Sequence, residues 1–199
     1  MERGLLNENP LRVGLTTRRT PPAAVMVIFG ASGDLAQRKL LPSLYRLSRE
    51  GALPGGFVVL GTGRRDWDDE TFREVVRGSF EEFLGEELTP QVWEDFSERL
   101  HFLSGSFKES AFYDQIETRM RELDEEKVGT GNVLFYLAVP PTAFVPIIQG
   151  LGRAGLSGRR NRRGWVRIVV EKPFGRDLES ARDLNEELSE WFHEEQIYR

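Results

Sequence analysis

The stretch Val25–Leu47, VMVIFGASGDLAQRKLLPSLYRL, places a run of β-branched and aromatic residues directly before two glycines and a helix-like segment. A continuous apolar run of this kind indicates a strand that is buried on both faces. Gly30 and Gly33 stand where that strand would turn into the helix, and Ala36 lies one helical turn further along. Because glycine carries no Cβ, such a turn can bring a phosphate group close to the unpaired N–H groups of a helix start.

The rest of the chain alternates between strand-like and helix-like segments. Further strands are expected at residues 57–61, 100–107, 132–139 and 165–170, after the first at 24–29. The alternation predicts an α/β fold with a Rossmann-like, doubly wound, mainly parallel sheet and helices on both faces. We assign residues 23–199 to this domain and the polar residues 1–22 to a flexible N-terminal extension. Pro42 is expected to interrupt the first helix, 34–50, in which Leu47 belongs to the apolar face.

The composition narrows the classes of function. The 199 residues carry a formal net charge of −5, which argues against a nucleic-acid partner. There is no cysteine and there are two histidines, so we expect no metal site and assign His101 and His193 structural or surface positions. No apolar run reaches membrane-spanning length and the N-terminus lacks the apolar core of a signal peptide. We therefore expect a cytoplasmic protein with no membrane partner.

The glycine turn and the end of the second strand together indicate that the protein binds a dinucleotide. The turn has the spacing G-x-x-G-x-x-A, which is not that of a P-loop and by itself would also suit a purely steric role. Folds that prefer NAD usually end the second strand with an acidic residue that binds the ribose 2′-hydroxyl. Here the sequence reads VVLGTGRRDW, with Arg64 and Arg65 just beyond the strand. A guanidinium group matches a 2′-phosphate, so the sequence favours NADP over NAD.

The stretch RIVVEKPFG, residues 167–175, supplies a third candidate. Lys172 stands at the carboxyl end of a predicted parallel strand, where it would face the crevice in which ligands bind. Pro173 favours an extended backbone at Lys172, and the bond between them could be cis. We expect Lys172 to contact a phosphate or hydroxyl group. The arginine-rich stretch 157–164 is predicted to be a solvated connection.

Three segments in order, GASGDLAQRKLLPSLYRL, LFYLAVPPTAF and EKPFG, resemble the N-terminal coenzyme domain of the glucose-6-phosphate dehydrogenase family, over residues 24–199. The resemblance implies NADP-dependent oxidation of glucose 6-phosphate to 6-phosphogluconolactone, which is the entry to the pentose phosphate pathway, by a homo-oligomer at full length. It implies that Lys172 also contacts the sugar phosphate. Together with the arguments above, the resemblance implies that the coenzyme-binding residues are Gly30, Ala31, Ser32, Gly33, Asp34, Leu35, Ala36, Gln37, Arg64, Ser106, Phe107, Tyr136 and Lys172.

The chain departs from the family pattern in two places. Where the family often carries an acidic residue near the coenzyme, this chain has Ser106 and Phe107, so that contact stays open. The family's substrate-binding and catalytic histidines, and its second α+β domain, follow the segment that ends here at Arg199. We therefore expect no catalytic residue in this chain and no activity from it alone. A stand-alone NADP-binding module or sensor is the alternative. The Tyr-x-x-x-Lys pair of short-chain enzymes is absent.

Overall fold

The computed structural model describes residues 20–158, 163–175 and 177–199. Most of the expected N-terminal extension and the centre of the arginine-rich stretch lie outside these residues. Within them, six parallel strands form one sheet in the order β3-β2-β1-β4-β5-β6. The strands are β1 (Val25–Phe29), β2 (Val58–Gly63), β3 (Leu100–Ser104), β4 (Val133–Leu137), β5 (Val166–Val170) and β6 (Ile197–Tyr198). The predicted doubly wound sheet is confirmed, and β6 is an additional strand.

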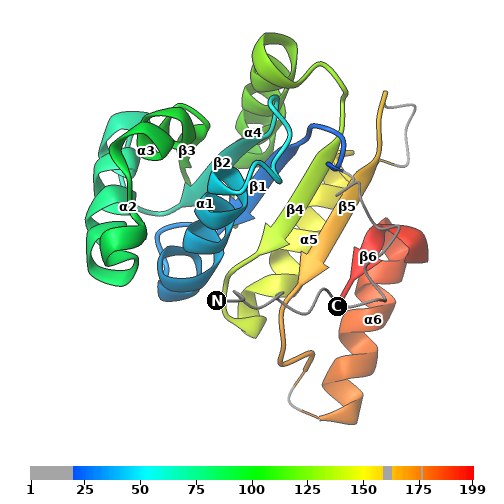
Figure 1. Cartoon of the computed structure of the whole chain (residues 1–199). Coiled ribbons are helices and arrows are strands. Elements are labelled where there is room, and N and C mark those ends of the chain that lie inside the picture. The colour runs from blue at the N-terminus through cyan, green and yellow to red at the C-terminus, as the bar shows by residue number, and fades with distance from the viewer. Residues whose placement is uncertain (1–19, 159–162, 176) are drawn as a thin grey trace, which may run out of the picture.

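Helices cover both faces of this sheet (Figure 1). The helices are α1 (Leu41–Arg49), α2 (Asp69–Phe83), α3 (Pro90–Ser97), α4 (Ser110–Leu123), α5 (Phe144–Arg153) and α6 (Leu178–Trp191). Side chains of α1, α2 and α3 build the apolar core on one face, and those of α4, α5 and α6 build the core on the other. None of the helices in the described residues is both long and apolar enough to cross a bilayer.

The order of the strands creates a switch point between β1 and β4. From β1 the chain adds β2 and β3 on one side, and then returns to add β4, β5 and β6 on the other. The connections that follow β1 and β4 therefore run in opposite directions from the carboxyl ends of these two strands. In open parallel sheets this position is where ligands bind.

The interruption expected at Pro42 takes the form of a π-helical turn, Ala36–Leu40, directly before α1. The N–H of Leu41 bonds to the carbonyl five residues earlier rather than four. Pro42 then lies in the first turn of α1, where its missing N–H costs little. The apolar face is shorter than predicted, because Leu44 is buried whereas Leu47 is 41% exposed.

The turn from β1 to the first helix is fixed on two sides. Gly30 has a φ of +85°, which disfavours any residue with a Cβ. The N–H groups of Gly30 and Ala31 both donate to the carbonyl of Thr62 in β2, at 3.0 Å. A Cβ built on Gly30 would lie 2.5 Å from the carbonyl oxygen of Ala138, just beyond β4. Glycine is therefore required here by backbone conformation and by the closeness of β4.

A polar cluster ties edge strand β3 to α2 and α4. His101 is buried in β3, with Nδ1 2.7 Å from Oδ2 of Asp69. The Phe102 N–H donates to the other carboxylate oxygen at 2.7 Å, and Arg119 donates to Oδ2 at 3.2 Å. Burial alone would raise the pKa of Asp69, but these hydrogen bonds and the charge of Arg119 outweigh it and hold the pKa at about 2. The structural position expected for His101 is thus confirmed.

Gly30→Ala should destabilise the fold, because the new Cβ meets both the strained φ and the Ala138 carbonyl. We expect the free energy of unfolding to fall by about 3 kcal/mol, measured by urea denaturation. Gly78→Ala is the matched control, since Gly78 lies inside α2 with nothing within 4 Å of a built Cβ. That variant should gain up to about 1 kcal/mol. Equal stability of the Gly30 variant and the parent would show that the turn can relax.

Asp69 should make stability depend on pH in the acid range. Its pKa is about 2 in the folded chain and about 4 when unfolded, so its stabilisation is present above pH ~4 and is lost as the pH falls from ~4 to ~2. Asp69→Asn is therefore expected to lower the free energy of unfolding by about 2 kcal/mol at neutral pH, with the difference shrinking towards pH ~2. Urea titrations across this pH range measure it.

The control for this experiment is Glu81→Gln, which removes the exposed partner of Arg77 at 3.3 Å. Its stability should follow the pH profile of the parent chain, because exposed ion pairs contribute little. If the free energies of unfolding of Asp69→Asn and the parent chain differed by the same amount down to pH ~2, the loss of stability in acid could not be assigned to Asp69.

Candidate functional site

A cleft of about 570 Å³ opens at the switch point. Its walls come from the turn after β1 and from the segments that follow β2, β3 and β4. The cleft is lined by Gly30, Ser32, Gly33, Gly63, Arg64, Ser106, Phe107, Lys108, Ala138, Val139, Pro140, Thr142, Ala143 and Pro146. Its size falls in the range of clefts that hold small molecules and cofactors.

Six of the residues inferred from the sequence meet in this cleft, from three separate parts of the chain. They are Gly30, Ser32, Gly33, Arg64, Ser106 and Phe107. Strand pairing explains the convergence, because β1, β2 and β3 are neighbours and their carboxyl ends lie at one edge of the sheet.

Three N–H groups of the glycine turn are already engaged within the protein. Those of Gly30 and Ala31 donate to β2, and that of Gly33 donates to the carbonyl of Gly30 at 2.9 Å. The turn is therefore shaped by its own hydrogen bonds.

The donors that the turn leaves for a ligand are the amides that follow. The N–H of Ser32 donates to no acceptor among the described residues. Asp34 and Leu35 open the helix, where N–H groups have no acceptor in a preceding turn. These donors, together with the positive end of the helix, form an arrangement that suits an anion.

Three other residues that we inferred to bind the coenzyme are buried under the turn and support it. Ala31 and Ala36 are fully buried, so their side chains do not reach the cleft. Gln37 is also buried, and its side-chain amide donates to the carbonyl of Ala31 at 2.8 Å. These residues fix the shape of the turn rather than line the cleft.

Arg64 follows β2 directly and lines the cleft with an exposed side chain. The backbone around it is tied to β3, since the Gly105 N–H donates to the Gly63 carbonyl at 2.8 Å and the Ser104 hydroxyl donates to the Arg65 carbonyl. Arg64 itself forms no hydrogen bond or ion pair with another described residue. Its guanidinium group is held on a fixed backbone and remains available to an anion.

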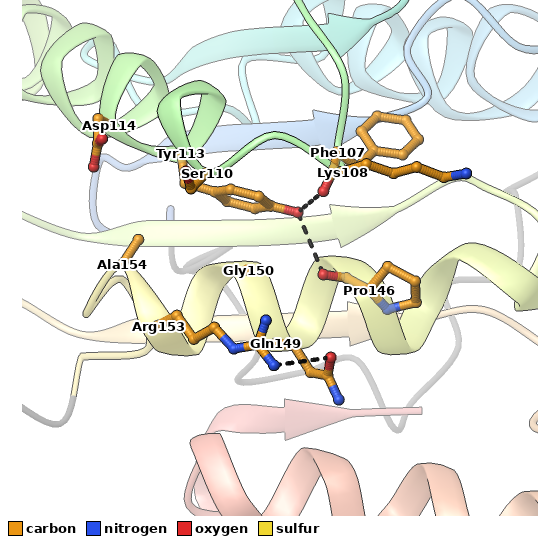
Figure 2. Close-up of a pocket in the computed structure, with 10 residues that line it drawn as sticks. All are labelled: Phe107, Lys108, Ser110, Tyr113, Asp114, Pro146, Gln149, Gly150, Arg153 and Ala154. Atoms are coloured by element: carbon orange, nitrogen blue, oxygen red, sulfur yellow. Dashed lines mark hydrogen bonds between the residues drawn. The ribbon is translucent and has the colours of Figure 1, made fainter.

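The segment after β3 forms a second wall. The Phe107 ring packs edge-on against Phe29, with ring centres 6.1 Å apart, and the Phe107 carbonyl accepts a hydrogen bond from Tyr113 at 2.7 Å. Figure 2 shows this contact in an adjoining hollow of about 400 Å³ between α4 and α5. Burial raises the pKa of Tyr113 to about 12, so its hydroxyl stays protonated and can donate.

Sequence reasoning missed Lys108 and Thr142, which also line the cleft. For Lys108 a signal existed, because it follows the third strand as Arg64 follows the second. Arg64 and Lys108 are the charged side chains among the lining residues. The cleft therefore combines two cations with the Ser32 N–H and adjoins the first N–H groups of the helix, a donor set that fits a phosphate-bearing group.

Tyr136 and Lys172 lie outside the residues that line this cleft. The Tyr136 hydroxyl donates to Glu171, and burial and this hydrogen bond both raise the pKa of Tyr136 above its usual value. Lys172 follows Glu171 at the carboxyl end of β5, with an exposed side chain and a cis bond to Pro173. The bond from Tyr136 thus reaches the residue next to Lys172 and ties β4 to that segment.

Neither histidine lines the cleft. His101 belongs to the polar cluster at β3, and His193 is exposed in the turn after α6, where its N–H donates to Gln196 at 2.8 Å. The lining residues also include no carboxylate. The cleft can therefore bind and orient an anion, but its described side chains offer no base that titrates near neutral pH.

Comparison with known proteins identifies the domain. The family described as "Glucose-6-phosphate dehydrogenase, NAD binding domain" matches residues 27–199. The glucose-6-phosphate 1-dehydrogenase of Chlamydia pneumoniae is 41% identical over 187 residues, which are 93% of this chain and 36% of that relative. The enzyme of the same name from Bacillus subtilis is 38% identical over 178 residues, with 89% and 35% covered. This chain thus spans little more than a third of the length of these relatives.

Solved structures agree with this result. A glucose-6-phosphate dehydrogenase in complex with its substrate glucose 6-phosphate has a TM-score of 0.78 and 32% identity, covering 89% of this chain and 36% of that one. The Mycobacterium avium glucose-6-phosphate 1-dehydrogenase has a TM-score of 0.75 and 34% identity, with 89% and 35% covered. The chain therefore belongs to the glucose-6-phosphate dehydrogenase family, and its residues 27–199 match the family's NAD-binding domain, which binds a nicotinamide coenzyme.

Proposed function

We propose that this domain binds NADP and serves an enzyme that oxidises glucose 6-phosphate to 6-phosphogluconolactone. The observation that carries the proposal is the meeting of the glycine turn and Arg64 in one cleft at the switch point. The turn offers donors for a diphosphate and Arg64 offers a charge for a further phosphate. Membership of the family supplies the nicotinamide coenzyme and the class of reaction.

The residues divide the coenzyme between two subsites. The amides of Ser32, Asp34 and Leu35 hold the diphosphate at the start of the helix, where the helix dipole favours negative charge. Arg64 holds the 2′-phosphate of the adenosine ribose through paired, charge-assisted hydrogen bonds. NAD lacks that phosphate, and the end of β2 offers no carboxylate to accept its ribose hydroxyl.

Lys172 and Tyr136 act further along the carboxyl edge of the sheet. Lys172 is a cation at the end of β5, and we assign it to the phosphate of the sugar and to the coenzyme. Tyr136 acts on this segment through its hydrogen bond to Glu171. In this arrangement the diphosphate lies at the end of β1 and the sugar lies on the side of β5.

The coenzyme, when bound, supplies a nicotinamide ring that accepts a hydride from the sugar. The residues described above bind and orient the coenzyme for that transfer, which is the part of catalysis that positioning provides. The hydroxyl proton must go to a base with a pKa near the working pH, usually a histidine. Neither histidine lies in the cleft or at the carboxyl edge of the sheet, so coenzyme binding and proton removal fall to different groups.

Arg64→Ala should weaken NADP+ binding much more than NAD+ binding, because only NADP+ carries the phosphate that Arg64 holds. The expected loss for NADP+ is roughly 1.5–3 kcal/mol, which corresponds to about tenfold or more in Kd. Titration of the chain with each coenzyme, followed by tryptophan fluorescence, measures both constants.

The matched control is Arg77→Ala, which removes a solvent-facing arginine from α2 and its ion pair with Glu81. It should leave both coenzyme affinities unchanged. If Arg64→Ala reduced the affinity for NADP+ and NAD+ equally, Arg64 would have no role in choosing between them.

The chain by itself should bind NADP+ without turning over glucose 6-phosphate, since neither histidine lies in the cleft or at the carboxyl edge of the sheet, where we place the sugar. The measurement is the absorbance of reduced coenzyme with NADP+ and glucose 6-phosphate at saturating concentrations. The Bacillus subtilis relative, assayed in parallel, serves as the positive control. Measurable turnover by the chain would refute the separation of binding from proton removal.

A further inference from the structure

Lys108 lines the same cleft as Arg64 and reaches it from the neighbouring strand. Arg64 follows β2, and Lys108 follows the neighbouring strand β3 after a short loop. The two segments are joined where the Gly105 N–H donates to the Gly63 carbonyl. Both side chains line the same cleft. The cleft thus receives one cation from each of the segments that follow two adjacent strands.

The side chain of Lys108 is exposed and directed along the sheet. Figure 2 shows it extending past Phe107, away from Gln149 and Arg153, in the direction in which β4 runs. That direction leads to the carboxyl edge of the sheet, where the cleft opens. Lys108 forms no ion pair or side-chain hydrogen bond with another described residue.

The fold gives no other reason for a cation at this place. Lys108 lies two residues before the first residue of α4, beside the positive end of that helix, so the helix dipole does not favour it. The N–H of Lys108 points to the Ser106 hydroxyl at 3.4 Å, a contact that any residue other than proline could make. The chain has a net charge of −5, yet this cleft is lined by cations and no carboxylate.

We propose that Lys108 is a second specificity-determining residue, which binds the 2′-phosphate of the coenzyme together with Arg64. This inference rests on the proposed function of the cleft. The strand order places Lys108 on the 2′-phosphate side, because the diphosphate turn follows β1 whereas Lys108 follows β3, on the far side of β2. A dianionic phosphate between the two side chains would be neutralised by one charge from each strand end.

The two cations should differ in what they contribute. The guanidinium of Arg64 is planar and can form two parallel hydrogen bonds, whereas the ammonium of Lys108 is a point charge on a flexible stem. Lys108 should therefore add electrostatic attraction to the phosphate without fixing its orientation. Its contribution should be smaller than that of Arg64 and should weaken more as salt is raised.

The test is calorimetric titration of the chain and of Lys108→Gln with NADP+ and NAD+, which differ only in the 2′-phosphate. Lys108→Gln is expected to weaken NADP+ binding about fivefold at low salt, the size expected for a partly exposed charge pair, and NAD+ binding by less than about twofold. Lys108→Arg should keep the preference for NADP+, and Lys108→Glu should reduce it further.

Lys127→Gln is the matched control, because it removes the same charge at the amino end of the sheet, where Lys127 donates to the Glu98 carbonyl at 3.0 Å. It should leave the ratio of the two affinities unchanged. An equal change for NADP+ and NAD+ in Lys108→Gln, or no change in either, would overturn the assignment of Lys108.

The same titrations separate this inference from the proposed function. If the unaltered chain bound neither coenzyme, or bound NAD+ as tightly as NADP+, the proposed function itself would fail. If the chain preferred NADP+ and Arg64→Ala removed that preference while Lys108→Gln kept it in full, only the role of Lys108 would be refuted.

Discussion

The backbone at Gly30 is the constraint on which the site depends. Its N–H is bonded to β2, and its Cα lies so close to the Ala138 carbonyl after β4 that no side chain fits. The turn is thereby fixed to both neighbours of the central strand. The N–H groups that can meet a ligand belong to Ser32, Asp34 and Leu35, which follow this turn. Because the turn is fixed by packing within the sheet, these N–H groups are in position before a ligand binds.

Much of the fold could be predicted because its central strands carry a local signal. β1 and β4 lie within continuous apolar runs, and the observed sheet buries β1 entirely. The short strand β6, Ile197–Tyr198, could not be predicted, because two residues have no periodicity and it forms only through its pairing with β5. The exposure of Leu47 could not be predicted either. Helical spacing shows which residues share a face, but it does not show how far along the helix that face is covered by the rest of the protein.

The candidate site could be predicted where function follows from backbone position. Gly30 and Arg64 stand at the ends of adjacent predicted strands, so their meeting in one cleft follows from a parallel sheet. The buried position of the Gln37 side chain could not be inferred, because nothing in the local sequence shows that its side-chain amide donates to the Ala31 carbonyl. Lys108 was overlooked because the third strand was predicted to run to residue 107, whereas β3 ends at Ser104 and a loop carries Lys108 to the cleft.

The distribution of charge explains how an acidic protein can hold a polyanion. A net charge of −5 repels phosphates at long range, but salt screens that repulsion over ~8–10 Å. What remains is contact, and at contact the cleft presents Arg64, Lys108 and backbone donors without a carboxylate. Such a site selects by opposite charge, and a phosphate monoester loses its second negative charge as the pH falls through about 6. Its affinity for such a group should therefore be greatest above pH ~7 and should weaken towards pH ~5.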